Sequence, residues 1–112
     1  MFRYNKYNNK KVEYDGIKFD SKKEANFYLT LKNLLEEGEI RDLELQKEYI
    51  LQNSFIINNK ARRKITYTAD FTFYSTHDNK MHVMDVKGCK TDVYKLKKKL
   101  FEYKYGIEIE EV

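Results

Sequence analysis

Two aspartates and one lysine lie on two segments that are predicted to be neighbouring strands. Asp70 lies within residues 66–73, and Asp85 and Lys87 lie within residues 82–88. Both segments show the alternation that is typical of half-buried strands. In the first segment, an apolar face opposite Asp70 is predicted to consist of Tyr67, Ala69, Phe71 and Phe73. Carboxylate oxygens are preferred ligands of hard divalent cations, and a nearby lysine can orient a nucleophile or neutralise charge that develops on phosphorus. The pattern therefore points to metal-dependent chemistry on a phosphate ester.

The turn between these two strands decides which residues face each other. A turn centred on residues 77–78 places Asp70 opposite Asp85, and a turn centred on residues 78–79 places Asp70 opposite Lys87. Opposed residues of an antiparallel pair point to the same face, with Cβ atoms about 4.5–5.5 Å apart. Either register therefore gathers the three groups on one face. A register shifted by one residue would also separate the apolar residues of the two strands, so it is disfavoured.

A third carboxylate, Glu24, is predicted to lie near the start of a helix over residues 21–37. Ser21 and Glu24 form an S-x-x-E capping box, and Gly38 suits the position after the helix. The apolar stripe of the helix consists of Phe27, Tyr28, Leu31, Leu34 and Leu35. At 100° per residue, Glu24 lies in the middle of this stripe. The capping box alone explains a glutamate here, but an unpaired buried carboxylate is costly, so we interpret Glu24 as a further ligand.

The remaining elements predict an α/β fold with a mixed sheet. Asp15-Gly16 indicates a small β-hairpin over residues 12–19. Strands are predicted at residues 43–51, 56–57, 64–74, 81–87 and 107–109, with turns at Asn58-Asn59 and residues 76–79. A second helix is predicted over residues 91–105, with Thr91 as N-cap and Gly106 after its end. We expect a basic N-terminal arm (residues 1–11) and one domain (residues 12–112), in which the first helix is followed by three antiparallel strands, a helix and a strand.

Basic side chains cluster near the predicted active strands. The second helix has apolar positions at Val93, Leu96, Leu100 and Tyr103, and its other side carries Lys95, Lys97, Lys98, Lys99 and Lys104. Such runs are often solvated helix faces. These lysines follow the second aspartate strand directly, so they could reach phosphates. The candidate DNA-binding residues are Gln46, Lys47, Arg62, Arg63, Thr91, Lys95 and Lys98. The Asn58-Asn59 turn would place Lys47 opposite Asp70, although the hairpin is long and irregular.

This pattern resembles the PD-(D/E)xK nuclease superfamily over nearly the whole chain after Val12. The matching residues are Ala69-Asp70-Phe71, Asp85-Val86-Lys87-Gly88 and the F-D-S-K-K-E opening of residues 19–24. A small family of phage-encoded, resolvase-like endonucleases is similar in that opening, in Y-x-A-D-F, in D-V-K-G-x-x-T and in the lysine-rich helix that ends in Tyr-Gly-Ile. Ala69 departs from the superfamily's naming pattern, in which proline stands at this variable position.

The resemblance implies a restriction-endonuclease-like core and a Mg²⁺- or Mn²⁺-dependent endodeoxyribonuclease. Asp70 and Asp85 would be metal ligands, the Val86 carbonyl a further ligand, Lys87 the catalytic lysine and Glu24 the helix-borne acid. The implied substrates are phage recombination or replication intermediates such as branched (Holliday) junctions, cut by a homodimer if both strands are cleaved. A catalytically silent or partner-dependent DNA-binding module with the same fold is the alternative, and a structural or host-interaction protein is a third possibility.

Composition limits the classes of protein to consider. The chain has 112 residues, with 22 basic and 18 acidic side chains and a net charge of +4. No apolar run approaches the ~18 residues of a membrane span, and we expect neither a signal peptide nor an organic cofactor. Cys89 is the only cysteine and cannot form an internal disulfide, which favours a reducing compartment, the host cytoplasm if the chain is phage-encoded.

Overall fold

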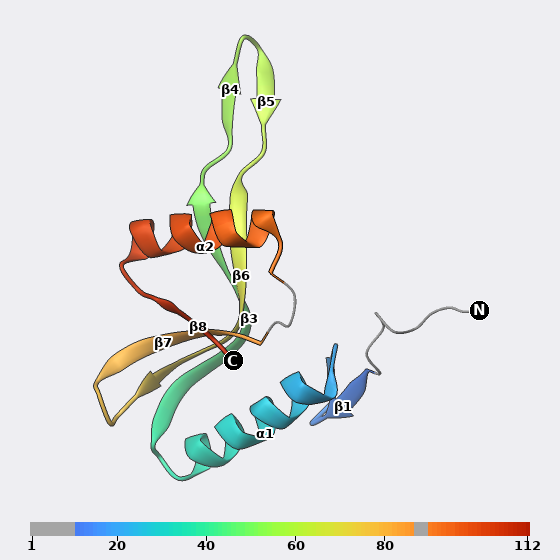
Figure 1. The fold of residues 1–112 in the computed structure, drawn as a ribbon, viewed down its shortest axis with the longest axis vertical. Coiled ribbons are helices and arrows are strands. Elements are labelled where there is room, and N and C mark those ends of the chain that lie inside the picture. Colours follow the sequence, from blue (N-terminus) through green and yellow to red (C-terminus); the bar gives the residue numbers. More distant parts are fainter. Residues whose placement is uncertain (1–10, 87–89) are drawn as a thin grey trace, which may run out of the picture. The chain divides into compact units, whose positions relative to one another are not determined.

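The structure, a computed structural model, describes residues 11–86 and 90–112 (Figure 1). The chain divides into two compact units, one ending at Glu39 and the other covering Ile40–Val112. Two helices and a mixed sheet confirm the predicted α/β class at this coarse level. That residues 12–112 form one domain stays a prediction, and the proposed arm lies outside the described residues except for Lys11.

The first unit begins with the hairpin that Asp15-Gly16 predicts. β1 (Val12–Tyr14) and β2 (Ile17–Phe19) are antiparallel, and the two turn residues have φ of 53° and 76°. Two consecutive left-handed residues are typical of a type I′ turn, whose twist matches that of the flanking strands. The Tyr28 hydroxyl donates a 2.8 Å hydrogen bond to Asp15, which ties the turn to the helix that follows.

That helix, α1 (Lys22–Glu36), starts with a variant of the predicted capping box. Ser21 is the N-cap and its hydroxyl accepts the Glu24 N–H at 3.1 Å. The Glu24 carboxylate accepts the Asp20 N–H at 3.3 Å, one residue before the cap. Gly38 follows the helix with φ of 77°, as predicted. Glu24 is buried together with Ala25, Tyr28 and Leu31, so the predicted burial of this carboxylate is confirmed.

The second unit is built on a four-stranded mixed sheet. The strands are β3 (Ile40–Gln52), β6 (Ile65–Ser75), β7 (Lys80–Asp85) and β8 (Ile109–Glu111), in the spatial order β3-β6-β7-β8. The first three are antiparallel, and β8 is parallel to β7. Parallel neighbours need a long crossover connection, and α2 (Asp92–Tyr105) supplies it.

Between β3 and β6 the chain forms a separate hairpin that projects beyond the sheet (Figure 1). Its strands, β4 (Phe55–Ile57) and β5 (Lys60–Arg62), pair only with each other among the described strands. Asn58 and Asn59 connect them with φ of 50° and 61°, so the predicted turn is confirmed.

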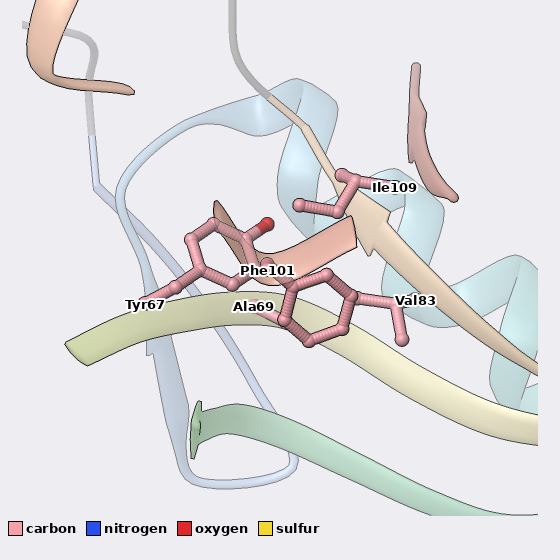
Figure 2. Packing of buried hydrophobic residues seen from close by; sticks show 5 residues of the cluster. All are labelled: Tyr67, Ala69, Val83, Phe101 and Ile109. Carbon is pink, nitrogen blue, oxygen red and sulfur yellow. The ribbon is translucent and has the colours of Figure 1, made fainter. Parts of the chain in front are cut away.

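The core of the second unit lies between the sheet and α2. Figure 2 shows five of its buried residues, Tyr67, Ala69, Val83, Phe101 and Ile109. Phe101 is the buried residue of α2, and its ring lies 4.9 Å from Tyr49, 5.5 Å from Tyr67 and 4.9 Å from Tyr105. Thr91 and Gly106 cap the helix as predicted. Within the described residues, no helix is both long and apolar enough to cross a membrane.

The face of α2 that packs on the sheet differs from the one that the predicted apolar positions suggest. Val93, Leu96, Leu100 and Tyr103 are all exposed. The packed face instead carries the buried Phe101 and the half-buried Tyr94, and Tyr105, although 37% exposed, contacts the rings of Tyr49 and Phe101. Aromatic side chains bury more area than aliphatic ones and gain from ring contacts, which favours packing of this face against the core.

Candidate active site

The aspartate pair, Asp70 and Asp85, lies on the adjacent strands β6 and β7, with Asp70 in the middle of β6 and Asp85 at the end of β7. The two strands pair from Phe71↔Met84 to Ser75↔Lys80, which is the register predicted for a turn centred on residues 77–78. The aspartates are the next residues on each strand beyond the Phe71↔Met84 pair. Their exposed fractions are only 2% and 1%. Both members of the predicted carboxylate pair are therefore buried where the pairing between β6 and β7 ends.

The Asp70 carboxylate accepts hydrogen bonds from the main chain and from a side chain. Oδ2 accepts the Val86 N–H at 2.7 Å, so this carboxylate reaches the chain neighbour of Asp85. Oδ1 accepts the side-chain amide of Gln46 at 3.2 Å. Gln46 has a φ of 54° in the middle of β3, a left-handed conformation that is unusual for a strand residue. The structure thus shows Gln46, predicted only as a DNA-binding residue, orienting the Asp70 carboxylate.

Lys47 does not oppose Asp70, and the prediction that it does is wrong. It pairs with Ala69, because the ladder between β3 and β6 slips by one residue between Ile50 and Gln52. Lys104 Nζ and the Tyr105 hydroxyl both donate to the Ile50 carbonyl, at 2.9 and 2.7 Å. These hydrogen bonds pair the Ile50 carbonyl at the slip. Their donors lie on α2, so counting residues from the turn cannot predict the slip.

Lys47 is instead engaged locally. Its Nζ lies 3.1 Å from the Glu44 carboxylate and 5.5 Å from the centre of the Tyr49 ring. Its pKa is raised, chiefly by the hydrogen bond to Glu44.

A buried tyrosine holds the second aspartate. The Tyr67 hydroxyl donates a 2.8 Å hydrogen bond to Asp85 Oδ2. Burial raises the pKa of Tyr67 far above its usual range, and the bond to Asp85 raises it further. The phenol therefore stays protonated and keeps donating to the carboxylate. Sequence reasoning treated Tyr67 as an apolar core residue and missed this role.

The contact between Tyr67 and Asp85 could not be predicted because the side chains of β6 do not alternate regularly between the two faces. Ala69 packs with Val83 in the cluster under α2, and Thr72 pairs with Val83, so residues 69 and 72 face the same side. The alternation is therefore interrupted between them, beside Asp70. Tyr67, Ala69, Phe71 and Phe73 are all buried as predicted, but they do not share one face. Tyr67 faces α2, and Phe73 pairs with His82 on the other side, so Tyr67 can reach Asp85.

A small open cavity of about 280 Å³ lies against Asp85. Hydroxyl-bearing side chains from β6 and from the start of α2 surround it, together with Lys97. They are Thr66, Thr68, Tyr67, Thr91 and Tyr94. Thr91 also accepts the Tyr94 N–H at 3.1 Å as the helix cap. Hydroxyls and one ammonium group beside a carboxylate form a suitable lining for a phosphodiester.

A second hollow, the lysine groove, has a volume of about 330 Å³. It is lined by Lys90, Lys95, Lys98, Lys99, Glu102 and Glu111. Lys98 lies 3.3 Å from Glu102, and Lys90 lies 2.9 Å from Glu111. The predicted DNA-binding residues Lys95 and Lys98 therefore belong to one hollow with an excess of positive charge.

The remaining predicted site residues are Glu24, Lys87, Val86, Arg62 and Arg63. Glu24 lies in the first unit, where it accepts the Asp20 N–H. Lys87 lies outside the described residues. Val86 is buried and its N–H binds Asp70. Arg62 ends β5 and Arg63 follows it, so both belong to the projecting hairpin.

The donor set suits one kind of metal ion better than others. Within residues 11–86 and 90–112, no group of three or more His, Cys, Asp or Glu side chains could hold a metal ion. Two adjacent carboxylates nevertheless fit Mg²⁺ or Mn²⁺, because Mg²⁺ sites commonly use one or two carboxylates plus water and substrate phosphate. The nitrogen and sulfur ligands typical of structural zinc are not part of this pair.

Comparison with known proteins gives one match. The sequence profile of a family described as "Protein of unknown function (DUF1064)" matches residues 4–110. No curated protein and no solved structure matches the chain. The matched range includes Glu24, both aspartates and Lys87.

Proposed function

The chain belongs to the DUF1064 family, whose function is unknown, and we propose that it is a metal-dependent endodeoxyribonuclease. The observation that carries the proposal is the aspartate pair: two buried carboxylates on adjacent strands, each held by hydrogen-bond donors. We further propose that the helices and the mixed sheet are the restriction-endonuclease-like core of the PD-(D/E)xK superfamily, acting in the host cytoplasm.

Asp70 and Asp85 would hold the cation, with the Val86 carbonyl and Glu24 as the further ligands that the family resemblance implies. When bound, Mg²⁺ or Mn²⁺ supplies Lewis acidity that polarises the phosphoryl oxygen and acidifies the attacking water. Gln46 and Tyr67 orient the two carboxylates, since donors behind a metal ligand fix its direction. Lys87 would orient the nucleophile or offset developing charge.

The surroundings of the aspartate pair support a nucleic-acid substrate. The hydroxyl-lined cavity beside Asp85 is large enough for a phosphate group, and Lys97 at its edge would neutralise charge. The lysine groove would bind flanking phosphates through residues such as Lys95 and Lys98. We propose branched recombination or replication intermediates as the substrate, and a homodimer where both strands of a junction are cut.

A cleavage panel tests the proposal. Linear, flapped and four-way DNA would be incubated with the protein in Mg²⁺, in Mn²⁺ and in EDTA. We expect cleavage of at least one substrate in either metal and none in EDTA. Asp85→Asn should lose cleavage by about 10³-fold or more, because losing several kcal/mol of metal-derived stabilisation costs a factor of ten per ~1.4 kcal/mol.

Asp42→Asn is the matched control for this panel. Asp42 is an exposed aspartate on β3 with a φ of 56°, a conformation that asparagine tolerates. It should cleave like the wild type. A folded wild type that cuts none of the substrates in either metal would contradict the nuclease proposal.

The alternative is a catalytically silent or partner-dependent module with the same fold. The lysine groove is the observation that favours it, because such a surface can bind DNA without a metal ion. Salt-dependent DNA binding in EDTA without cleavage in either metal would support this alternative over the nuclease.

A further inference from the structure

The hairpin of residues 53–64 contributes nothing to the core of its unit. We call it the basic arm; it is a different segment from the N-terminal residues 1–11. It projects beyond the four-stranded sheet (Figure 1), and every residue from Gln52 to Ile65 is exposed. An isolated two-stranded hairpin is marginally stable in water at best. An arm that exposes both faces is therefore better explained by a binding role than by support of the fold.

The basic arm is strongly positive. It contains Lys60, Arg62, Arg63 and Lys64 and no acidic residue, so its own net charge is +4. Lys64 lies 3.4 Å from Glu48. The other three cations have no acidic partner among the residues that the structure describes. Positive charge is therefore clustered on an exposed projection and remains available to a polyanion.

Large apolar side chains share the arm with these cations. Phe55, Ile56 and Ile57 are 43%, 75% and 50% exposed. Phe55 pairs with Arg62 and Ile57 pairs with Lys60, so one face alternates apolar and cationic groups. Ile56 pairs with Ala61 on the other face. The arm thus presents apolar surface and phosphate-binding groups together within two short strands.

This combination fits DNA in which base pairing is interrupted. Cations bind phosphates of any DNA, but apolar side chains gain only where base faces are open or a base step can be wedged apart. Duplex ends, flaps and branch points offer such faces next to phosphates. The lysine groove of the same unit adds a second polyanion-binding surface, which favours a long polyanion over a small ligand or an acidic peptide.

We propose that the basic arm binds branched or unpaired DNA, with Lys60, Arg62 and Arg63 on phosphates and Phe55, Ile56 and Ile57 against unstacked bases. This inference deepens the proposed function and rests on it for DNA as the substrate. It assigns the recognition of DNA structure to the arm and leaves hydrolysis to the aspartate pair.

The test is DNA binding in EDTA, where hydrolysis does not occur. Arg62→Gln/Arg63→Gln should weaken binding to duplex and four-way DNA alike and lower the salt dependence by about 0.9 per lost phosphate contact. Phe55→Ser/Ile56→Ser should keep duplex affinity but lose about tenfold of the preference for four-way DNA, since stacking contributes ~1–3 kcal/mol per base. Thermal unfolding should match the wild type, because the arm lies outside the core.

Matched controls come from exposed residues outside the arm. Lys80→Gln removes an exposed lysine at the start of β7, and Leu96→Ser removes an exposed leucine from α2. Both should bind like the wild type. Arm variants that bind both DNAs like the wild type would overturn the proposal. The proposal would also be overturned if Phe55→Ser/Ile56→Ser changed the oligomeric state of the protein in solution, or its binding to anionic vesicles, without changing the preference for four-way DNA.

Failure of this inference is distinct from failure of the proposed nuclease function. If the protein cuts DNA and the arm variants bind and cut normally, the arm proposal fails and the nuclease stands. If the protein cuts nothing but binds four-way DNA through the arm, the arm proposal stands and the nuclease fails.

Discussion

The aspartate pair and the basic arm are opposite solutions to the problem of binding a charged ligand. Asp70 and Asp85 are acidic, almost completely buried and held by donors that include Gln46, Tyr67 and Val86. The basic arm is exposed on both faces and positively charged. Chemistry on a phosphodiester needs groups that are held in place, whereas recognition of DNA shape tolerates groups that adjust. The contrast teaches that one small unit can separate the two tasks.

The largest expected effect contrasts two phenylalanines. Phe101 is completely buried under the sheet, and Phe55 is exposed on the basic arm. Phe101→Ala should lower the free energy of unfolding by about 3–5 kcal/mol, because it leaves a cavity in the core. Phe55→Ala should change it by no more than ~0.5 kcal/mol. Urea denaturation of the full chain measures both, and a similar loss in the two variants would erase the distinction between core and arm.

The Tyr67 hydroxyl offers a sharper test of how the aspartate pair is held. Tyr67→Phe keeps the ring in the core but removes the donor to Asp85. We expect the Mg²⁺ concentration for half-maximal cleavage to rise about 10–100-fold, as for other donors behind metal ligands. Tyr49→Phe is the control, since Tyr49 also packs on Phe101. An unchanged Mg²⁺ requirement in Tyr67→Phe would show that this hydroxyl does not position the ligand.

Metal bound by the aspartate pair should stabilise the folded protein, and substitutions in the basic arm should not change this effect. A ligand that binds only the folded state adds about 2.7 kcal/mol at a hundredfold excess over its Kd. Mn²⁺ should therefore raise the unfolding temperature of the wild type and of Arg62→Gln/Arg63→Gln, but not that of Asp70→Asn. An equal rise in all three proteins would place the metal elsewhere.

The smallest expected effect concerns His82, which belongs to neither region. Partial burial lowers the pKa of His82, but its hydrogen bonds and charge interactions with Glu110 and Asp78 outweigh burial, so the pKa is raised. A raised pKa means that His82 stabilises the fold fully below its unfolded pKa, and the contribution disappears as pH rises through the folded pKa.

Urea denaturation at pH 5.5 and pH 8.5 checks this prediction. The wild type should lose about 0.2–1 kcal/mol more than His82→Gln over this interval, the size typical of partly exposed ion pairs. DNA binding by the arm in EDTA should not follow the same titration. A His82→Gln variant with the wild-type pH dependence would contradict the assignment.

Local chemistry made much of the fold predictable. Turns at Asp15-Gly16 and Asn58-Asn59 have left-handed residues where the sequence indicates them. Ser21 and Thr91 cap helices through their own hydroxyls. The register between the two aspartate strands is one of the two that turn counting and apolar pairing allow. These features depend on residues close in sequence, so a single chain reveals them.

The rest depends on contacts between distant segments. The left-handed Gln46 and the slip after Ile50 displace Lys47, and α2 stabilises that slip. A helical wheel cannot choose between the aliphatic and aromatic stripes of α2, because each is a plausible buried face. Tyr67 reaches Asp85 only because the alternation of β6 breaks beside Asp70. Such irregularities are set by tertiary packing, which propensity rules do not describe.

Electron paramagnetic resonance of Mn²⁺ tests the central claim, that Asp70 and Asp85 together hold a divalent cation. The free-ion signal would be titrated with the wild type, Asp70→Asn, Asp85→Asn and the Asp42→Asn control, each with and without four-way DNA at a pH where little DNA is cut. We predict that the wild type and the control bind Mn²⁺ alike and that either site variant weakens binding at least tenfold. Equal binding by all four proteins, or none by the wild type even with DNA, would contradict the claim.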